Sequence, residues 1–169
     1  MSSKIQAYPG TEVSLKDIEA NRFLMTRYET LLRYSWTSGV AISRFLDGLQ
    51  KGEILGLKCA KCGRTLVPPR AYCEEDFVPI DEWVKVKDTG VVNTFSISYV
   101  NNDASRRKKP IIVAVIEIDG ASPGMGILHL LGETEPEKVE VGMKVEAVWK
   151  PKAQRKGAIT DIKYFRPRR

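Results

Sequence analysis

This chain of 169 residues has only one histidine and three cysteines, and aromatic residues make up 8% of it. No apolar run approaches the roughly 20 residues that a membrane-crossing helix needs. The first 14 residues also lack the apolar segment of a signal peptide. The three cysteines have a metal-like spacing, which agrees with a reducing compartment better than with a disulfide framework. From these absences we expect a cytoplasmic protein with no membrane partner.

Sequence signatures of catalysis are missing as well. The chain has no G-x-S-x-G, P-loop or G-x-G-x-x-G motif, and the glycine-rich stretch at 120–126 lies between two expected strands as a hairpin turn. His129 lies inside the apolar stretch GILHLLG, where a structural role is favoured over a catalytic one. We therefore expect no catalytic residue and no enzyme activity, and a small enzyme that uses His129 is the weaker alternative.

The three cysteines that are present lie within fifteen residues of one another. Cys59 and Cys62 form a C-x-x-C pair followed by Gly63, and Cys73 begins what should be a second pair. A C-x-x-C turn directs two thiolates at one metal ion about 2.3 Å away, and two such turns complete a tetrahedron around zinc. We predict a structural zinc site, and the alternative is a segment with three buried thiols that binds no metal.

The fourth corner of this site falls at Asp76, where another cysteine would be expected. A carboxylate oxygen binds zinc at about 2.0–2.2 Å, so three thiolates and one carboxylate form a reasonable ligand set. We predict that Asp76 completes the site with the three cysteines. Water, Glu74 and Glu75 are the competitors for that position.

Composition and pattern divide the chain into three parts. We expect a helical arm at 1–52, a zinc ribbon at 53–83 and a strand-rich domain at 84–169. The ribbon is too short to bury a substantial core, so a metal would supply the free energy that apolar burial cannot. The protein as a whole should be mainly β with helices at its N-terminus.

Apolar residues at helical spacing predict two helices in the arm. The first should run from about residue 15 to 33 and start with a capping arrangement of Ser14 and Asp17. The second should begin near Thr37 or Ser38. Two helices alone cannot bury these faces and form a domain, so they must dock on the rest of the chain or on a partner protein. The apolar faces consist of Leu24, Tyr28, Leu31 and Leu32 in the first helix and of Ile42, Phe45, Leu46 and Leu49 in the second.

From Trp83 onward the sequence alternates as strands do and predicts five of them in about 85 residues. The first should be long, covering 84–100 around a turn at 88–90, and only 134–139 leaves space for a helical turn. A long first strand and a short insert after the third match the five-stranded OB-fold barrel. A β-sandwich is the alternative, although five strands are few for one.

Basic residues gather in the strand-rich part of the chain. Residues 84–169 carry 16 Lys and Arg against 10 Asp and Glu, a net charge of +6, whereas 1–52 and 53–83 carry +2 and −2. Two loops flank the ligand face of an OB-fold, and both are basic here, so we expect them to converge on a cleft for a phosphate-bearing ligand. The alternative is two solvated loops. The expected binding residues are Arg106, Arg107, Lys108 and Lys109 in the first loop and Lys152, Arg155 and Lys156 in the second, beside Lys150.

Single-stranded nucleic acid is one ligand that would suit such a cleft. Aromatic platforms for stacked bases usually contribute ~1–3 kcal/mol each to this kind of binding. Phe95, Tyr99, Trp149 and Tyr164 lie on expected strands, although the core needs some of them. The pattern permits nucleic-acid binding without being specific for it.

The order of these parts resembles one protein family. An F-L-x-G-L-x-x-G stretch at 45–52 precedes C-x-x-C-G at 59–63 and P-P-R-x-x-C at 68–73, and F-x-P at 165–167 ends the expected barrel. The chain is similar in these features, over residues 35–167, to the acyl-CoA-associated zinc-ribbon plus OB-fold family called domain of unknown function thirty-five. Its archaeal members are the most similar. Further matching positions are Gly90, Val92, Gly142 and Val145.

The resemblance implies a rubredoxin-like zinc ribbon joined to an OB-fold. It implies a non-catalytic accessory subunit that binds a thiolase or a hydroxymethylglutaryl-CoA synthase on the mevalonate route and helps to form a binding site for CoA. The 3′-phosphate and pyrophosphate of CoA would suit the basic loops as well as nucleic acid does. The family's ligand residues carry over loosely, and Asp76 departs from its four-cysteine ribbon.

Overall fold

The computed structural model describes residues 13–22 and 33–168, which fall into two compact units, 1–36 and 37–169. In the first unit, α1 (Leu15–Glu19) begins at a capping box in which Ser14 and Asp17 bond to each other's backbone N–H groups, as predicted. The helix is shorter than the expected 15–33, because Asn21 takes a left-handed φ of 51°. The expected apolar face, from Leu24 to Leu32, lies outside the described residues.

The second unit opens with α2 (Gly39–Lys51), close to where the second helix was expected. The helix ends at Gly52, whose left-handed φ of 84° lets its N–H bond back to the carbonyls of Gly48 and Leu49. Phe45 and Leu49 are buried on one face. Among the described residues no helix is long and apolar enough to cross a membrane.

A small three-stranded sheet carries the cysteine segment, in the order β2-β1-β3. It consists of β1 (Ile54–Lys58), β2 (Thr65–Leu66) and β3 (Glu82–Val86), all antiparallel. Residues 84–86, which we expected in the first barrel strand, therefore pair with β1 instead. The alternating pattern of β3 suits either sheet, so only the pairing decides which one it joins.

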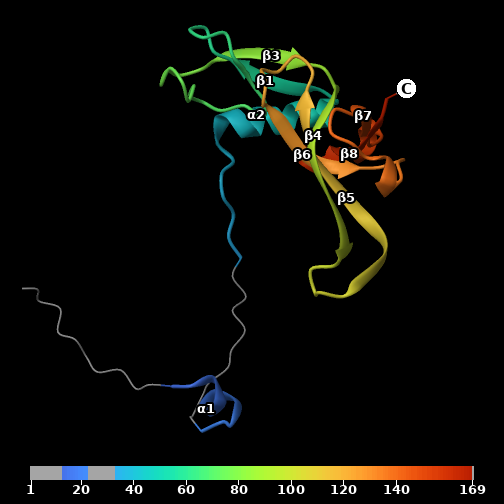
Figure 1. The fold of residues 1–169 in the computed structure, drawn as a ribbon. Coiled ribbons are helices and arrows are strands. Elements are labelled where there is room, and N and C mark those ends of the chain that lie inside the picture. Colours follow the sequence, from blue (N-terminus) through green and yellow to red (C-terminus); the bar gives the residue numbers. More distant parts are fainter. Residues whose placement is uncertain (1–12, 23–32, 169) are drawn as a thin grey trace, which may run out of the picture. The chain divides into compact units, whose positions relative to one another are not determined.

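The remaining strands form a closed barrel in the order β4-β5-β6-β8-β7. This is the OB-fold that the sequence predicts, with the short helix η1 (Pro136–Lys138) in the expected insert after the third barrel strand. Figure 1 shows the long hairpin of β4 and β5 projecting beyond the barrel. The barrel strands are β4 (Thr89–Val100), β5 (Arg106–Ile118), β6 (Gly126–Leu131), β7 (Lys144–Trp149) and β8 (Ile162–Pro167).

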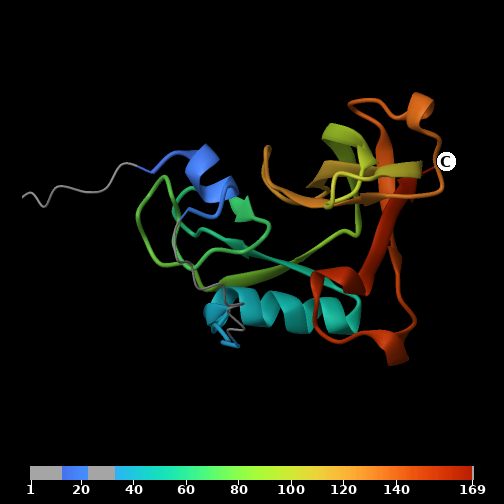
Figure 2. The same cartoon turned by 90° about the horizontal axis from the view of Figure 1, so that it is seen from below.

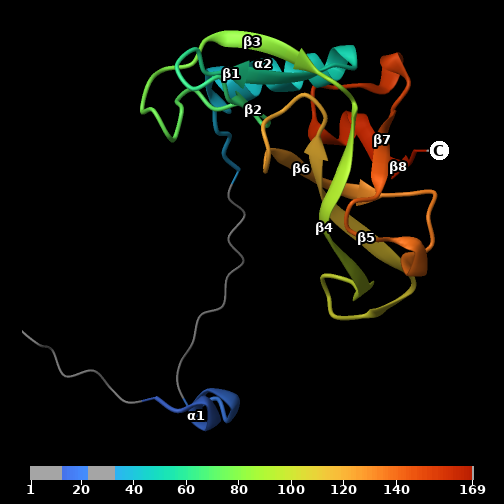
Figure 3. The same ribbon diagram turned by 45° about the horizontal axis from the view of Figure 1, so that its top comes forward.

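One hydrophobic core joins α2, the small sheet and the barrel. Phe45 and Leu49 of α2 belong to the same buried cluster as Ile54 of β1 and as Ile116 and Phe165 of the barrel. In Figures 2 and 3 the helix lies along the small sheet, and Figure 2 shows the β7–β8 connection (red) reaching the C-terminal end of α2. The apolar face of α2 is thus covered by the chain itself.

A second, smaller core surrounds the cysteines. Leu57 of β1 and Leu66 of β2 pack with Ile80 and with the buried side chains of Cys59 and Cys73. Because this cluster is small, it stabilises the cysteine segment less than the main core stabilises the barrel. The small size of this core agrees with the prediction that a metal helps to stabilise the segment.

Candidate metal centre and basic grooves

The first cysteine turn follows β1. The N–H of Gly63 donates to the carbonyl of Cys59 over 2.8 Å, and the N–H of Cys59 donates to the carbonyl of Arg64 over 2.8 Å. Gly63 has a φ of 74°, in the left-handed region that glycine adopts at little cost. This tight turn brings Cys62 back beside Cys59.

The second turn repeats the first, although it contains no glycine. The N–H of Phe77 donates to the carbonyl of Cys73 over 3.0 Å, and the N–H of Cys73 donates to the carbonyl of Val78 over 2.9 Å. Phe77 takes the left-handed conformation, with a φ of 54°. Asp76 consequently occupies the place in this turn that Cys62 occupies in the first.

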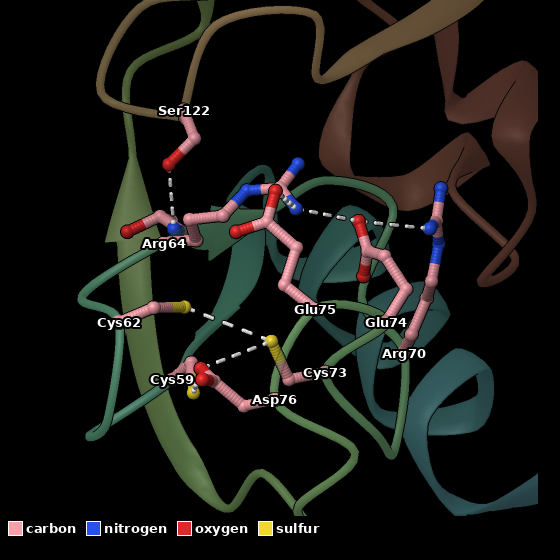
Figure 4. A network of polar contacts seen from close by, with 10 residues as sticks. Cys59, Cys62, Arg64, Arg70, Cys73, Glu74, Glu75, Asp76 and Ser122 are labelled. Carbon is pink, nitrogen blue, oxygen red and sulfur yellow. Dashed lines mark hydrogen bonds and ion pairs between the residues drawn. The ribbon is translucent and has the colours of Figure 1, made fainter.

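The two turns bring the four predicted ligands together (Figure 4). Oδ2 of Asp76 lies 3.3 Å from Sγ of Cys59 and 3.6 Å from Sγ of Cys73, and the Sγ atoms of Cys62 and Cys73 are 3.6 Å apart. One donor atom from each residue lies within 4.8 Å of all the others. A tetrahedral zinc ion with thiolate bonds of about 2.3 Å separates its ligand atoms by roughly 3.8 Å. The donor set therefore fits zinc in both chemistry and spacing.

The carboxylate and the thiols shift each other's protonation. The Asp76 carboxylate, which accepts a hydrogen bond from the thiol, raises the pKa of Cys62 to about 12. Hydrogen bonds from Cys62, and then from Cys59 and Cys73, hold the pKa of Asp76 below its ordinary value. Without a metal the Cys62 thiol therefore stays protonated at neutral pH, and a divalent cation must displace this proton to bind.

The acidic neighbours of Asp76 face away from the sulfur atoms. Nη1 of Arg64 lies 2.9 Å from a carboxylate oxygen of Glu74 and 2.8 Å from one of Glu75. Arg70 also pairs with Glu74, at 3.3 Å. Of the three acidic residues considered for the fourth ligand position, Asp76 is thus the one whose carboxylate the fold turns toward the cysteines.

The first basic cluster lies in β5 and not in the loop where we expected it. The loop of the β4–β5 hairpin covers only residues 101–105, and strand pairing extends to Arg106. Arg107 is half-buried and donates to the side chain of Asn101 and to the carbonyl of Lys109. The cluster lies in a strand because the β4–β5 hairpin is long and its two strands stay paired beyond the barrel.

Two of these residues line a groove of about 610 Å³ on the barrel surface, which we call the hairpin groove. Lys108 and Lys109 lie there with Tyr99, and the acidic side chains of Glu135 and Glu137 line it too. The groove therefore offers both signs of charge around an aromatic surface. Arg106 and Arg107 do not line it.

The second basic cluster is spread over the β7–β8 connection. Lys150 lines a more apolar groove of about 490 Å³, the β6 groove, together with Lys163 of β8. Arg155 instead lies 5.3 Å over the ring of Trp149 and donates to the carbonyl of Lys150 over 2.8 Å. Lys152 lies in the short helix η2 (Lys152–Gln154). The linings of the two grooves include none of Lys152, Arg155 and Lys156.

The two grooves are neighbours, because Leu130 and Tyr164 line both. The structure thus brings Lys108, Lys109 and Lys150 to adjoining surfaces, while the other predicted binding residues lie elsewhere. Sequence reasoning missed Lys163. Its position beside Tyr164 in the alternating pattern of β8 is the signal that could have placed it on the barrel surface.

His129 is held by backbone groups on both sides of its ring. Its Nδ1 accepts from the N–H of Leu130 over 2.9 Å, so the proton resides on Nε2, which donates to the carbonyl of Ile159 over 3.2 Å. The ring also packs edge-on against Phe165, with centroids 5.7 Å apart. These contacts favour the structural role expected for His129.

Comparison with known proteins places this arrangement in a family. Residues 46–81 match the model of the ChsH2 rubredoxin-like zinc ribbon domain, and residues 83–150 match that of the ChsH2 C-terminal OB-fold domain. A DUF35 domain-containing scaffold protein of Methanocaldococcus jannaschii is 30% identical over 98 residues, which are 57% of this chain and 67% of that protein. The chain belongs to the DUF35 family. The resemblance of its motifs to this family is thereby confirmed.

Two further DUF35 proteins extend the comparison. A scaffold protein of the same description from Methanothermobacter thermautotrophicus is 26% identical over 124 residues, covering 70% of this chain and 90% of that protein. A crystal structure of a DUF35 protein of unknown function from Sulfolobus solfataricus is 34% identical, with a TM-score of 0.54 and coverage of 62% and 75%.

The DUF35 fold also occurs in a solved enzyme complex. The Ltp2–ChsH2(DUF35) aldolase structure matches with a TM-score of 0.56 and 19% identity, over 80% of this chain and 98% of that one. At this identity the likeness shows a shared fold.

Proposed function

We propose that this DUF35 protein is a non-catalytic scaffold subunit that binds an acyl-CoA condensing enzyme of the thiolase or hydroxymethylglutaryl-CoA synthase type. The observation that carries the proposal is the family membership, since both curated relatives are named scaffold proteins. A solved protein with the same fold belongs to an aldolase complex, which adds support for an enzyme partner. The three cysteines, none of them in a disulfide, suit a cytoplasmic complex.

In this proposal each part of the chain has a role. Of the expected arm at 1–52, the part before residue 37 would contact the partner, because α2 packs on the chain itself. The expected ribbon at 53–83 extends to Val86 of β3, and the barrel occupies the rest of the expected domain at 84–169. Zinc bound by the three cysteines and Asp76 would be structural, because four protein ligands leave no open position for a substrate. Metal would supply the ordering free energy that the small core of the ribbon lacks.

The barrel would bind the CoA part of an acyl-CoA. The hairpin groove and the β6 groove combine the ammonium groups of Lys108, Lys109 and Lys150 with apolar and aromatic side chains. Phosphates favour such cations, and the pantetheine arm suits an apolar surface. The arginines and lysines outside the grooves, Arg106, Arg107, Lys152, Arg155 and Lys156, would act on the CoA phosphates through longer-range attraction.

Copurification tests the scaffold role. We expect the tagged full chain, expressed in its native host, to retain a thiolase-like or synthase-like enzyme through size exclusion. Recovery of the full chain without any acyl-CoA enzyme would contradict the proposal.

Calorimetry with acetyl-CoA tests the ligand, with the full chain and with the chain in complex with its partner. We expect the reversal of Lys108 and Lys109 to glutamate to weaken binding at least tenfold, which is about 1.4 kcal/mol. The matched control reverses Lys51 and Lys144, which are exposed on α2 and β7. Equal affinity in both variants would contradict CoA binding at the grooves. Salt-sensitive binding of oligonucleotides without heat from acetyl-CoA would favour the nucleic-acid alternative.

A further inference from the structure

The two carboxylate oxygens of Asp76 face different groups. Oδ2 lies among the sulfur atoms, 3.3 Å from Sγ of Cys59 and 3.6 Å from Sγ of Cys73. Oδ1 lies 3.4 Å from Nζ of Lys61. The carboxylate is largely buried, with 15% of the side chain exposed, whereas Lys61 is 65% exposed. One oxygen is thus directed to the ligand cluster and the other to an ammonium group at its rim.

The position of Lys61 follows from the sequence of the first turn. It lies between Cys59 and Cys62, whereas Asp76 belongs to the second turn. The Lys61–Asp76 pair therefore joins the two halves of the candidate metal centre. A cysteine in the place of Asp76 would offer no second acceptor atom for this contact.

The other cations close to the ribbon are engaged elsewhere. Arg64 and Arg70 pair with Glu74 and Glu75. Of the ion pairs among the described residues, the one with Lys61 is the only one that includes a predicted metal ligand. Three thiolates and a carboxylate around a divalent ion carry a net charge of −2, and the ammonium group reduces it.

We propose that Lys61 is a positioning residue of the metal centre, which holds Oδ1 of Asp76 so that Oδ2 alone binds the ion. Because the ammonium group of Lys61 is exposed to solvent, the ion pair should add little to folding stability, and we expect its main effect on metal affinity. Groups that orient a ligand from outside the coordination sphere typically change metal affinity by about 10–100-fold. This role is independent of the scaffold and CoA proposals, because it concerns the ribbon alone.

Zinc affinity of the full chain, measured by competition with a chromophoric chelator, tests the role. We expect Lys61→Met to weaken zinc binding by about tenfold, the lower end of the usual range because Lys61 is exposed. Lys61→Arg, which keeps the positive charge, should restore most of the affinity. The control is Lys58→Met, which removes an ion pair at 3.5 Å with Glu82 on the neighbouring strand and should leave the affinity unchanged, since neither residue is a predicted metal ligand.

A double-mutant cycle shows whether Lys61 acts through Asp76. In the Asp76→Ala background, Lys61→Met should have a much smaller effect on zinc affinity, because only the attraction between the ammonium group and the thiolates remains. The visible absorption of the cobalt(II)-loaded protein gives a second readout, since loss of the lysine should change the d–d bands as the second oxygen approaches the ion. Equal zinc affinity in Lys61→Met and wild type, or an undiminished effect of Lys61→Met without Asp76, would overturn the proposal. So would equal affinity in Asp76→Ala and wild type.

Discussion

Asp161 is the buried carboxylate that closes the β7–β8 connection. Only 1% of the residue is exposed, and its two oxygens accept from the backbone N–H groups of Lys156, Gly157 and Ala158 at 3.0, 2.8 and 3.1 Å. These three hydrogen bonds stabilise the observed conformation of the loop. The loop carries part of the second basic cluster, so Asp161 fixes residues that sequence reasoning assigned to ligand binding.

We expect Asp161→Asn to destabilise the fold by about 2–3 kcal/mol at pH 7, because the amide cannot accept from all three N–H groups. Urea denaturation at equilibrium measures the change. Asp103→Asn is the matched control, since Asp103 is exposed and also accepts from a backbone N–H, that of Ser105 at 3.0 Å. An equal loss of stability in both variants would contradict the role of the buried carboxylate.

The same residue predicts a pH dependence of stability. Burial, the largest single influence, raises the pKa of Asp161, but the three backbone hydrogen bonds and nearby Lys150 outweigh it and leave the pKa below the ordinary value of 3.8. A carboxyl group with a lowered pKa in the folded state stabilises the protein above the unfolded-state value and loses this effect as the pH falls through the folded-state value. The stability difference between wild type and Asp161→Asn should therefore shrink below about pH 4.

Among the elements, β5 is approached closely by both of its neighbours. A Cβ atom on Gly126 of β6 would collide with the carbonyl oxygen of Ile116, and one on Gly90 of β4 would collide with that of Glu117. Both glycines thus allow the barrel to close tightly around the same part of β5. Glycine is needed at these two positions because a side chain would not fit, and not because of the backbone conformation, since neither residue has a positive φ.

We expect Gly126→Ala to lower the free energy of unfolding by about 1–3 kcal/mol, the usual cost of inserting a methyl group where none fits. Thermal unfolding followed by circular dichroism measures it. Leu128→Ala, on the same strand but 65% exposed, should change stability by less than about 0.5 kcal/mol. A Gly126→Ala protein as stable as this control would show that the strands can move apart at little cost.

The whole molecule divides into a short N-terminal unit and a larger unit that contains the cores. Both hydrophobic cores consist of residues from 41 onward among those that the structure describes. The apolar face of α2 packs on the chain itself, so the proposed contact with a partner falls to the unit before residue 37. Tyr34 and Trp36, which are exposed and have ring centroids 5.7 Å apart, belong to that part.

A chain shortened to residues 37–169 should therefore unfold at the same temperature as the full chain. The physical reason is that, among the residues that the structure describes, the deletion removes none that belongs to either core. Differential scanning calorimetry of the two proteins checks the prediction. A markedly lower melting temperature of the shortened chain would show that the arm contributes to the fold.

The sequence alone determined the features that depend on spacing and periodicity. The separations of Cys59, Cys62, Cys73 and Asp76 define the two turns, and alternation in the C-terminal part defines the barrel strands. The motifs also indicated the family, because a turn or strand needs particular residues at particular intervals.

Only the tertiary structure decided which surfaces meet. From the sequence, the apolar face of α2 could have packed on a partner protein or on the barrel, and β3 could have joined either sheet. The hydrophobic effect favours burial of an apolar face but does not specify which surface covers it. The basic loops changed most, because the long hairpin moved Arg106 to Lys109 into β5 and Arg155 turned onto Trp149. The contacts of a long cationic side chain depend on which groups the fold brings near it, and these cannot be predicted from the sequence alone.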